Sequence, residues 1–316
     1  MKNRFVPPKN LSIGIVGNLA KPSTCDTACA LIKILEERKI KFVVQSEIAA
    51  RMKTACNYDA GISALQSSEI PGRADIIVSL GGDGTILRTA KLVGESGKPI
   101  LGINLGKLGF LAELNFDELR NSIDELFKGK FNIEERSALL ATFQFDGRTS
   151  TIFALNDIVI DKAGSSRMID LETYVDSEYL ITYRADGIVI STPTGSTGYS
   201  LSTGGPIISP ESRVIAISPI SPHTLTARPV IVPDDSEIRV VVRSDSLPEA
   251  DVSPAQKQVM VNADGQTSHH LKQPVEIKVS LAPHKIKLLR KSKNGFFNLL
   301  RTKLMWGVDI RSEEKT

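Results

Sequence analysis

The chain has 316 residues, enough for two domains and a sizeable hydrophobic core. Its charge is nearly balanced, with 39 Lys and Arg residues against 36 Asp and Glu residues, so electrostatics gives no reason to expect nucleic acid or a membrane as the main partner. No apolar stretch approaches the roughly 20 residues that a membrane span requires, and the N-terminus leads into polar and proline residues rather than a signal peptide. The three cysteines fit a reducing compartment. We therefore expect a soluble, cytoplasmic protein.

Strand and helix patterns alternate over the first 135 residues. Continuous apolar runs predict buried strands at residues 11–18, 41–45, 74–80 and 99–104. Apolar residues at helical spacing predict helices at residues 26–39, 85–95 and 117–128, and one or two more between residues 46 and 72. This alternation predicts a parallel sheet covered on both faces, with ligands beyond the carboxyl ends of its strands.

The glycine turn Gly81–Thr85 lies between a predicted strand and a predicted helix. Glycines let the backbone approach an anion closely, and the free N–H groups and positive dipole end of the helix attract it. The turn also contains Asp83, which is useful beside a phosphate if it binds a metal ion or takes a proton from an attacking hydroxyl. The turn is not a P-loop, because no Lys-Ser/Thr pair follows its last glycine. An ordinary Asp-Gly turn is the alternative.

From about Glu134 the pattern changes to an all-β one. Strand-like segments are separated by turn residues with hardly any helical spacing between them, at residues 139–145, 151–160, 171–175, 179–183, 214–217, 238–242 and 275–279. A stretch rich in Ser, Pro and acidic residues, Ser244–Gln256, is predicted to be a surface loop. The chain is thus expected to have an α/β domain at residues 1–135, an all-β domain at residues 136–282 and a C-terminal segment at residues 283–316.

The C-terminal segment carries two signals. Apolar residues between Asn294 and Trp306 predict a helix that packs on the first domain or on another subunit. The basic run from Lys285 to Arg301 is interpreted as the solvated face of a helix.

Two further stretches are less specific. Gly102–Phe110 is rich in glycine but lacks the G-x-G-x-x-G spacing of a Rossmann fold, and an ordinary strand-end loop explains it at least as well. Asn156-Asp157 is an amide next to a carboxylate at a strand edge. The amide can pair with the ring edge of a base, and the carboxylate can accept hydrogen bonds from a pair of ribose hydroxyls. A plain turn explains this pair equally well.

The stretch Tyr183–Pro206 holds a run of hydroxyls and glycines that offers many hydrogen-bond donors, and Tyr199 offers a face for stacking. A Ser/Gly linker has the same composition, but the apolar segments Ile188–Ile190 and Tyr199–Leu201 interrupt it, which favours a binding loop. Asp264-Gly265-Gln266 is most simply a hairpin turn, and its polar side chains could face the same cleft.

Taken together, these motifs resemble those of the NAD kinase family and occur in the same order. The resemblance runs from about Ile13 to Gly307 and rests on Gly81–Thr85, Leu108–Leu111, Leu155–Asp157, Asp186-Gly187, Ser191–Ser200, Pro222-His223, Leu225–Pro229 and Asp264–Gln266. The glycine turn alone is shared with diacylglycerol kinases and, loosely, phosphofructokinases, whereas the Thr-Pro-Thr-Gly-Ser-Thr stretch is not. The resemblance implies an α/β first domain, a β-sandwich-like second domain and a C-terminal segment that returns to the first.

The resemblance also implies an activity. The family phosphorylates the 2′-hydroxyl of the adenosine ribose of NAD, giving NADP, with ATP or in some members polyphosphate as donor. A divalent metal, magnesium or manganese, takes part, and subunits assemble as a homodimer or homotetramer.

The implied roles fall on particular residues. Asp83 would be the general base, and Gly81, Gly82, Gly84 and Thr85 would cradle phosphate beside it. Asn156 and Asp157 would hold adenine and ribose. Many relatives have Glu where this chain has Asp157, and the Asp side chain is the shorter of the two. The other implied binding residues are Arg88, Phe110, Arg167, Arg184, Ala185, Asp186, Thr197, Gly198, Tyr199, Ser200, Leu201, Ser202 and Gln266.

Two other functions are weighed against this one. A lipid kinase of the diacylglycerol type would not need the hydroxyl-rich stretch Ser191–Ser202, and a non-catalytic dinucleotide sensor would not need Asp83. The choice between ATP and polyphosphate, the use of NADH and the size of the oligomer are not set by the sequence.

Overall fold

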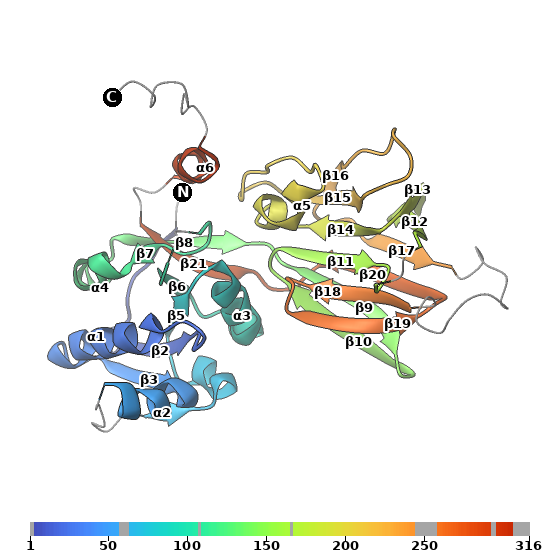
Figure 1. Ribbon diagram of the computed structural model, residues 1–316. Helices are drawn as coiled ribbons and strands as arrows, with labels where there is room; N and C mark the ends of the chain where they lie inside the picture. The colour runs from blue at the N-terminus through green and yellow to red at the C-terminus, as the bar shows by residue number, and fades with distance from the viewer. Residues whose placement is uncertain are drawn as a thin grey trace, which may run out of the picture. The chain divides into compact units, whose positions relative to one another are not determined.

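The structure is a computed structural model that describes residues 3–56, 63–106, 109–164, 167–243, 258–291 and 295–305. It divides into two compact units, one formed by residues 1–135 with residues 287–316 and the other by residues 136–286 (Figure 1). The first unit is α/β and the second is all-β, which confirms the predicted fold class. The predicted loop at Ser244–Gln256 and Trp306 lie outside the described residues.

The α/β unit is built on one sheet. Its strand order is β1 (Asn3–Arg4), β8 (Phe131–Arg136), β21 (Ile286–Lys291), β6 (Ile100–Asn104), β5 (Ile76–Gly81), β2 (Ser12–Gly17), β3 (Lys41–Gln45) and β4 (Ala64–Leu65), with β7 (Leu114–Asn115) paired to β6. The strands from β21 to β4 run parallel, and β1 pairs antiparallel with β8. Its helices are α1 (Ser23–Glu37), α2 (Ser46–Ala55), α3 (Asp83–Val93), α4 (Leu119–Phe127) and α6 (Phe296–Leu304), with 3₁₀ turns η1 (Ser67–Gly72), η2 (Gly94–Ser96) and η3 (Phe116–Glu118).

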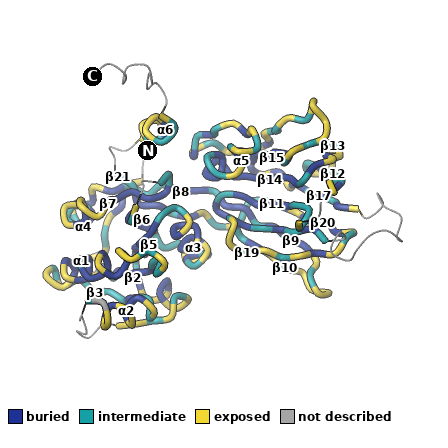
Figure 2. Tube along the Cα trace, viewed as in Figure 1, coloured by how far each residue is buried: buried dark blue, intermediate teal, exposed yellow. Residues whose placement is uncertain are grey.

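Strand β5 shows why the sheet is covered on both faces. All of its residues are buried, and alternate side chains of a strand point to opposite faces. Ile76, Val78 and Leu80 belong to the same hydrophobic cluster as residues of α1, whereas Ser79 Oγ lies 2.8 Å from Thr89 Oγ1 of α3. The helices α1 and α4 contact each other, and α3 contacts η1. Figure 2 shows the sheet as the buried interior of this unit.

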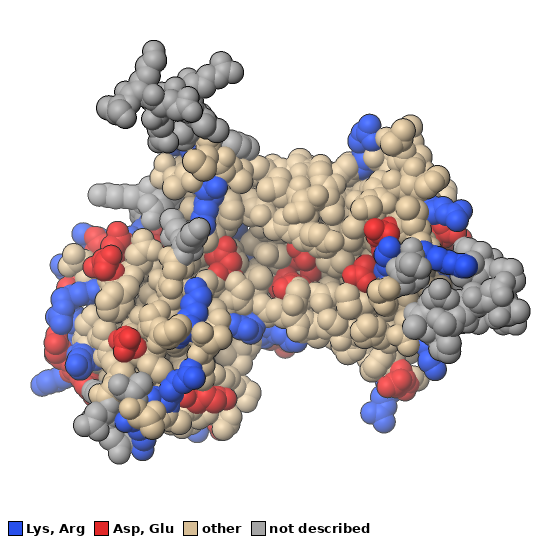
Figure 3. Space-filling model, in the orientation of Figure 1, with Lys and Arg blue, Asp and Glu red and all other residues tan. Residues whose placement is uncertain are grey.

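The basic run at the C-terminus is not the face of a helix, contrary to the interpretation of the sequence. Ile286–Lys291 is strand β21, which pairs with β6, and only residues from Phe296 onward are helical. The charge of Arg290 is neutralised by ion pairs with Glu113 and Glu134, at 3.0 and 3.2 Å, so it does not need solvent. On the face seen in Figure 3, basic and acidic side chains are interspersed over the α/β unit, as the balanced composition predicts.

The all-β unit consists of two antiparallel sheets around one core. One sheet has the order β10 (Arg148–Ala154), β9 (Leu139–Phe145), β20 (Val275–Leu281), β17 (Ile238–Val242), β12 (Ile169–Val175) and β13 (Glu178–Ala185). The other has the order β16 (Val230–Pro233), β15 (Val214–Ile220), β14 (Gly187–Ser191), β11 (Asp157–Asp161), β18 (Gln258–Ala263) and β19 (Thr267–Lys272). The short helices η4 (Gly195–Thr197) and α5 (Tyr199–Ser202) follow β14. Alternate residues of both sheets, such as Ile158, Ile188, Val240 and Ile277, form a single hydrophobic cluster.

Two predicted elements differ from the structure. The predicted strand at residues 151–160 is two strands, β10 and β11, which belong to different sheets and are separated by Leu155 and Asn156. The predicted helical region at residues 46–72 contains α2, the short strand β4 and η1. None of the helices in the described part of the chain is long and apolar enough to cross a membrane.

Candidate functional site

The glycine turn of the α/β unit joins β5 to α3. Strand β5 ends at Gly81, Gly82 precedes the helix, and Asp83 is the first residue of α3. A Cβ atom at Gly81 would lie 2.1 Å from Thr85 Oγ1, so a side chain does not fit there. Thr85 in turn accepts a hydrogen bond from the Gly82 N–H at 3.4 Å. The tight turn therefore depends on the absence of a side chain at Gly81 and on the hydroxyl of Thr85.

This turn lies where parallel α/β sheets bind ligands. From β2 the chain crosses through α1 to β3 on one side, and from β5 it crosses through α3 to β6 on the other. The carboxyl ends of β2 and β5 are therefore a topological switch point. Lys21, between β2 and α1, places its ammonium 3.7 Å from where a Cβ at Gly82 would lie and 3.2 Å from where one at Gly106 would lie. A cation beside a helix N-terminus suits an anion such as phosphate.

The carboxylate of Asp83 binds a neighbouring backbone segment. It accepts hydrogen bonds from three consecutive N–H groups, those of Phe110 at 2.7 Å, Leu111 at 3.0 Å and Ala112 at 3.4 Å. A Cβ at Gly109 would lie 1.9 Å from Asp83 Oδ1, so only glycine permits this approach. The glycine-rich stretch after β6 thus serves the position of Asp83. Residues 107 and 108, part of the predicted motif, lie outside the described ranges.

Arg290 holds the carbonyl groups of the same segment. Its guanidinium donates to the carbonyl oxygens of Phe110 at 2.8 Å and Ala112 at 3.5 Å, and it is an ion-pair partner of Glu113. The side chain of Arg290 is 11% exposed and that of Glu113 is 2% exposed, so the pair is largely desolvated. Sequence reasoning missed both residues, because no local pattern links positions 177 residues apart.

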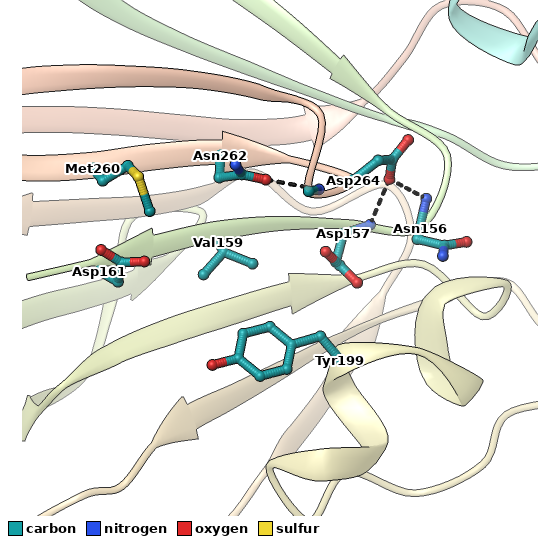
Figure 4. A pocket seen from close by; sticks show the side chains of 9 residues that line it. Asn156, Asp157, Val159, Asp161, Tyr199, Met260, Asn262 and Asp264 are labelled. Atoms are coloured by element: carbon teal, nitrogen blue, oxygen red, sulfur yellow. Dashed lines mark hydrogen bonds between the residues drawn. The ribbon is translucent and has the colours of Figure 1, made fainter. Parts of the chain in front are cut away.

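The all-β unit contains a pocket of about 380 Å³ on the outer face of the β11 sheet (Figure 4). Alternate residues of β11 and β18 point into it, because their other residues face the core. Tyr199 of α5 forms another wall. The lining residues are Asn156, Asp157, Val159, Asp161, Tyr199, Met260, Asn262, Asp264 and Gly265.

Asp264 shapes the wall of this pocket. Its carboxylate accepts hydrogen bonds from the N–H groups of Leu155 at 2.8 Å, Asn156 at 2.7 Å and Asp157 at 3.2 Å. Leu155 and Asn156 separate β10 from β11, and Asp157 is the first residue of β11. Figure 4 shows the hydrogen bonds from Asn156 and Asp157 to Asp264. The structure confirms the hairpin turn predicted at Asp264. The sequence predicted only that the polar side chains of this turn could face the cleft, and it gave Asp264 no role of its own.

Asp157 is the most perturbed acid of the pocket. It is only 5% exposed, and burial, together with the nearby charge of Asp264, raises its pKa from 3.8 to about 7. A hydrogen bond from the Tyr199 N–H acts in the opposite direction. Burial also raises the pKa of Asp161, at the other end of β11, against hydrogen bonding from Ala163. Carboxyl groups with raised pKa values in a pocket are typical of functional sites.

The hydroxyls of the predicted binding loop mostly face inward. Thr192 Oγ1 donates to the Leu155 carbonyl at 2.7 Å, and Ser196 Oγ donates to the Pro193 carbonyl at 2.7 Å. Thr192, Thr194, Ser196 and Ser200 are all buried. A Cβ at Gly195 would lie 2.2 Å from the Asn156 carbonyl oxygen, so the loop packs directly against the Asn156 backbone. These hydroxyls shape the loop, and Tyr199, 45% exposed, is its contribution to the pocket.

The remaining predicted residues occupy several environments. Arg88, Arg167, Arg184, Ser202 and Gln266 are exposed, and Thr197, Gly198 and Leu201 are half-buried near the pocket's Tyr199. Ala185 is part of the hydrophobic core, and Asp186 forms an ion pair with Lys162 at 2.7 Å. The structure thus brings together Asn156, Asp157 and Tyr199 in one pocket, and Gly81–Thr85 with Phe110 in the other unit.

The described residues do not form a protein ligand set for the expected divalent metal. Among the described residues, no group of three or more His, Cys, Asp or Glu side chains is placed so that it could hold a metal ion. Asp83, the carboxylate within the glycine turn, is already bonded to three backbone N–H groups. We therefore assign no step of the chemistry to a metal held by the protein.

Comparison with known proteins accounts for both units. Residues 13–131 match the ATP-NAD kinase N-terminal domain, and residues 155–291 match the ATP-NAD kinase C-terminal domain. The NAD kinase of Moorella thermoacetica is 43% identical over 302 residues, covering 96% of this chain and 92% of that protein. The NAD kinase of Geobacter sp. strain M21 is 40% identical over 93% of this chain and 98% of that protein.

Solved structures show the same fold. The chain is similar to yeast NADH kinase complexed with NADH, with a TM-score of 0.84, 27% identity and coverage of 98% of this chain and 95% of that one. An NAD kinase from Archaeoglobus fulgidus in complex with ATP shares the fold, with a TM-score of 0.71 and 23% identity over 93% of this chain and 99% of that one. The chain is a kinase. It belongs to the NAD kinase family, as the sequence motifs predicted.

Replacing Arg290 tests the ion-pair network around Phe110–Ala112. Arg290→Gln should lower the free energy of unfolding of the α/β unit by about 3 kcal/mol, because buried Glu113 loses a charged partner. Urea unfolding followed by circular dichroism measures this change. Arg120→Gln, which breaks an exposed pair with Glu37, should leave the unfolding midpoint unchanged. Equal effects of the two substitutions would contradict the role given to Arg290.

The raised pKa of Asp157 predicts a stability that falls as pH rises. Between pH 3.8 and about 7 the folded chain binds more protons at Asp157 than the unfolded chain does. The free energy of unfolding therefore decreases across this window, and the decrease is complete above it. Asp157→Asn should therefore match the wild type near pH 4 and exceed it at pH 8. The difference in unfolding free energy should reach up to about 4 kcal/mol, because each tenfold change in proton affinity corresponds to about 1.4 kcal/mol. Urea unfolding at both pH values measures it.

Asp146→Asn is the matched control, because Asp146 lies in an exposed turn. It should show no such divergence from the wild type. If Asp157→Asn were equally stable relative to the wild type at pH 4 and pH 8, the burial and charge ascribed to the Asp157 environment would be wrong.

Proposed function

We propose that the chain transfers the terminal phosphate of ATP, or of polyphosphate, to the 2′-hydroxyl of the adenosine ribose of NAD, giving NADP. The observation that carries this proposal is the place of Asp83: a carboxylate fixed by three hydrogen bonds beside a glycine turn at the carboxyl end of β5. Membership of the NAD kinase family supports NAD as the acceptor.

Asp83 acts as the general base in this proposal. A carboxylate has about four acceptor sites, and the backbone N–H groups occupy two on Oδ1 and one on Oδ2. One site on Oδ2 is thus available to the ribose hydroxyl. Because transition states of phosphoryl transfer are loose, the carboxylate orients the hydroxyl and takes its proton late.

The donor phosphates bind at the start of α3. The positive end of the α3 dipole favours the anion at this turn, and the Lys21 ammonium balances its charge. ATP as donor is supported by the ATP complex of the Archaeoglobus relative. Magnesium or manganese would bind together with the donor phosphates, since Mg²⁺ commonly uses substrate phosphates as ligands.

The pocket of the all-β unit holds the nucleotide acceptor. Asp157 accepts or shares hydrogen bonds with ribose hydroxyls, and Tyr199 supplies a face for stacking. Asn156 Oδ1 is buried and, within the described ranges, has no hydrogen-bond partner, so it is an acceptor for the amino group of a base. The NADH complex of the yeast relative supports a dinucleotide as the ligand. The homodimer or homotetramer and the cytoplasmic location stay predictions.

A coupled assay tests the proposed reaction. The purified chain is mixed with NAD, a divalent metal and either ATP or polyphosphate, and NADP is measured with an NADP-specific dehydrogenase. We expect NADP with ATP, because the glycine turn, Lys21 and Asp83 together meet the needs of phosphoryl transfer. Tight binding of NADP without turnover under either donor and either metal would instead identify a dinucleotide sensor. Phosphorylation of diacylglycerol but not NAD would identify a lipid kinase.

A further inference from the structure

The break between β10 and β11 is held from both sides by side chains. Asp264 accepts the three N–H groups of Leu155, Asn156 and Asp157, and its own N–H donates to the Asp157 carbonyl at 3.1 Å. On the other side, Thr192 Oγ1 donates to the Leu155 carbonyl at 2.7 Å and the Thr192 N–H donates to the Asn156 carbonyl at 2.9 Å. The backbone of Leu155–Asp157 is therefore almost fully hydrogen-bonded, although Leu155 and Asn156 belong to neither strand.

The residue that holds the break is itself fixed. Asp264 and Gly265 have positive φ values of 55° and 67° in the hairpin turn between β18 and β19. The Gln266 N–H donates to the Ala263 carbonyl at 2.9 Å, and the Gly265 N–H donates to Asn262 Oδ1 at 2.7 Å. A rigid turn at the end of a paired hairpin keeps the Asp264 carboxylate in one place.

The carboxylate of Asp264 also affects Asp157 through its charge. Asp157 faces Tyr199 of α5 across the pocket, has Asp161 further along its own strand, and has Asp264 opposite it on the hairpin turn (Figure 4). None of the residues that line the pocket is a Lys, Arg or His. A second negative charge beside a desolvated carboxyl group favours its protonated form, so Asp264 raises the pKa of Asp157.

We propose that Asp264 is a positioning residue of the nucleotide pocket: it fixes the Leu155–Asp157 backbone so that Asn156 and Asp157 line the pocket, and it places a negative charge beside the Asp157 carboxyl. This inference rests on the proposed function only for the identity of the ligand, NAD. Asp264 acts through Asn156 and Asp157 and takes no part in the transfer of the phosphate.

The first test removes the negative charge of Asp264 but keeps the shape of its side chain. In Asp264→Asn, the titration midpoint of the Asp157 carboxyl, measured by ¹³C NMR of the full chain, should lie below the wild-type midpoint because the neighbouring negative charge is gone. The control is Asp176→Asn, since Asp176 also has a positive φ of 55° in a hairpin turn and also accepts a backbone N–H, that of Glu237 at 2.9 Å. An Asp157 midpoint that is the same in Asp264→Asn and Asp176→Asn would overturn the electrostatic part of the proposal.

The second test measures NAD binding by calorimetry across pH. Asp264→Asn should weaken NAD binding by about tenfold, because the N–H groups of Leu155–Asp157 lose hydrogen bonds to a charged carboxylate. Asp176→Asn should not change NAD binding. The pH at which NAD affinity changes should also move downward in Asp264→Asn alone. A loss of affinity that is the same at every pH would indicate a merely structural role and overturn the proposal.

A wild-type measurement covers the case in which Asp264→Asn does not fold. The amide protons of Leu155, Asn156 and Asp157 should exchange with solvent at least about tenfold more slowly than that of Gly147 in an exposed turn, because a hydrogen-bonded amide must open to exchange. Equal rates would overturn the proposal. If the wild type binds no NAD while the Asp157 midpoint and amide exchange behave as described, then the proposed function fails and the positioning role of Asp264 stands.

Discussion

The arrangement of this protein depends on one interaction, a carboxylate that accepts three consecutive backbone N–H groups. Segments that follow a strand but do not continue it carry polar backbone groups that need partners when buried. In the α/β unit Asp83 provides these partners for Phe110–Ala112, and Arg290 binds carbonyls of the same segment. In the all-β unit Asp264 and Thr192 do the same for Leu155–Asp157. Two unrelated folds thus use the same solution.

This solution has consequences for chemistry. A carboxylate that is hydrogen-bonded to a fixed backbone cannot change its rotamer, so its remaining acceptor site has a defined position. Asp83 can therefore orient a hydroxyl, and Asp264 can fix the side chains on either side of a strand break. The glycines near both segments are explained by this packing, because a side chain at Gly109 would meet Asp83 and one at Gly195 would meet the Asn156 carbonyl.

The parts of the fold that depend on local pattern could be predicted from the sequence. The apolar run before Gly81 and the helical spacing after Thr85 predicted β5, the turn and α3, and the pair Asn156-Asp157 marked a pocket wall. Partners far apart in sequence could not be predicted, because no local pattern reports them. Arg290 was interpreted as part of a solvated helix because its glutamate partners lie more than 150 residues away.

The hydroxyl-rich loop shows a second limit of sequence reasoning. Composition indicated many donors, but it cannot tell whether a hydroxyl points to a ligand or to the backbone. The structure shows that Thr192 and Ser196 bind carbonyl groups of the protein, and that an aromatic residue, Tyr199, faces the pocket. The strand break at Leu155 was missed for a similar reason, since an apolar run does not show where a chain passes from one sheet to another.

The central claim is that the Asp83 carboxylate takes part in phosphate transfer in addition to holding Phe110–Ala112. The most direct measurement compares kcat for NADP formation and the NAD dissociation constant of Asp83→Asn with those of the wild type. Asn keeps the shape of the side chain and one acceptor oxygen but is not a base. We expect kcat to fall about 100-fold or more, the range for loss of a general base, while the NAD dissociation constant stays within about threefold. A kcat equal to that of the wild type would contradict the claim.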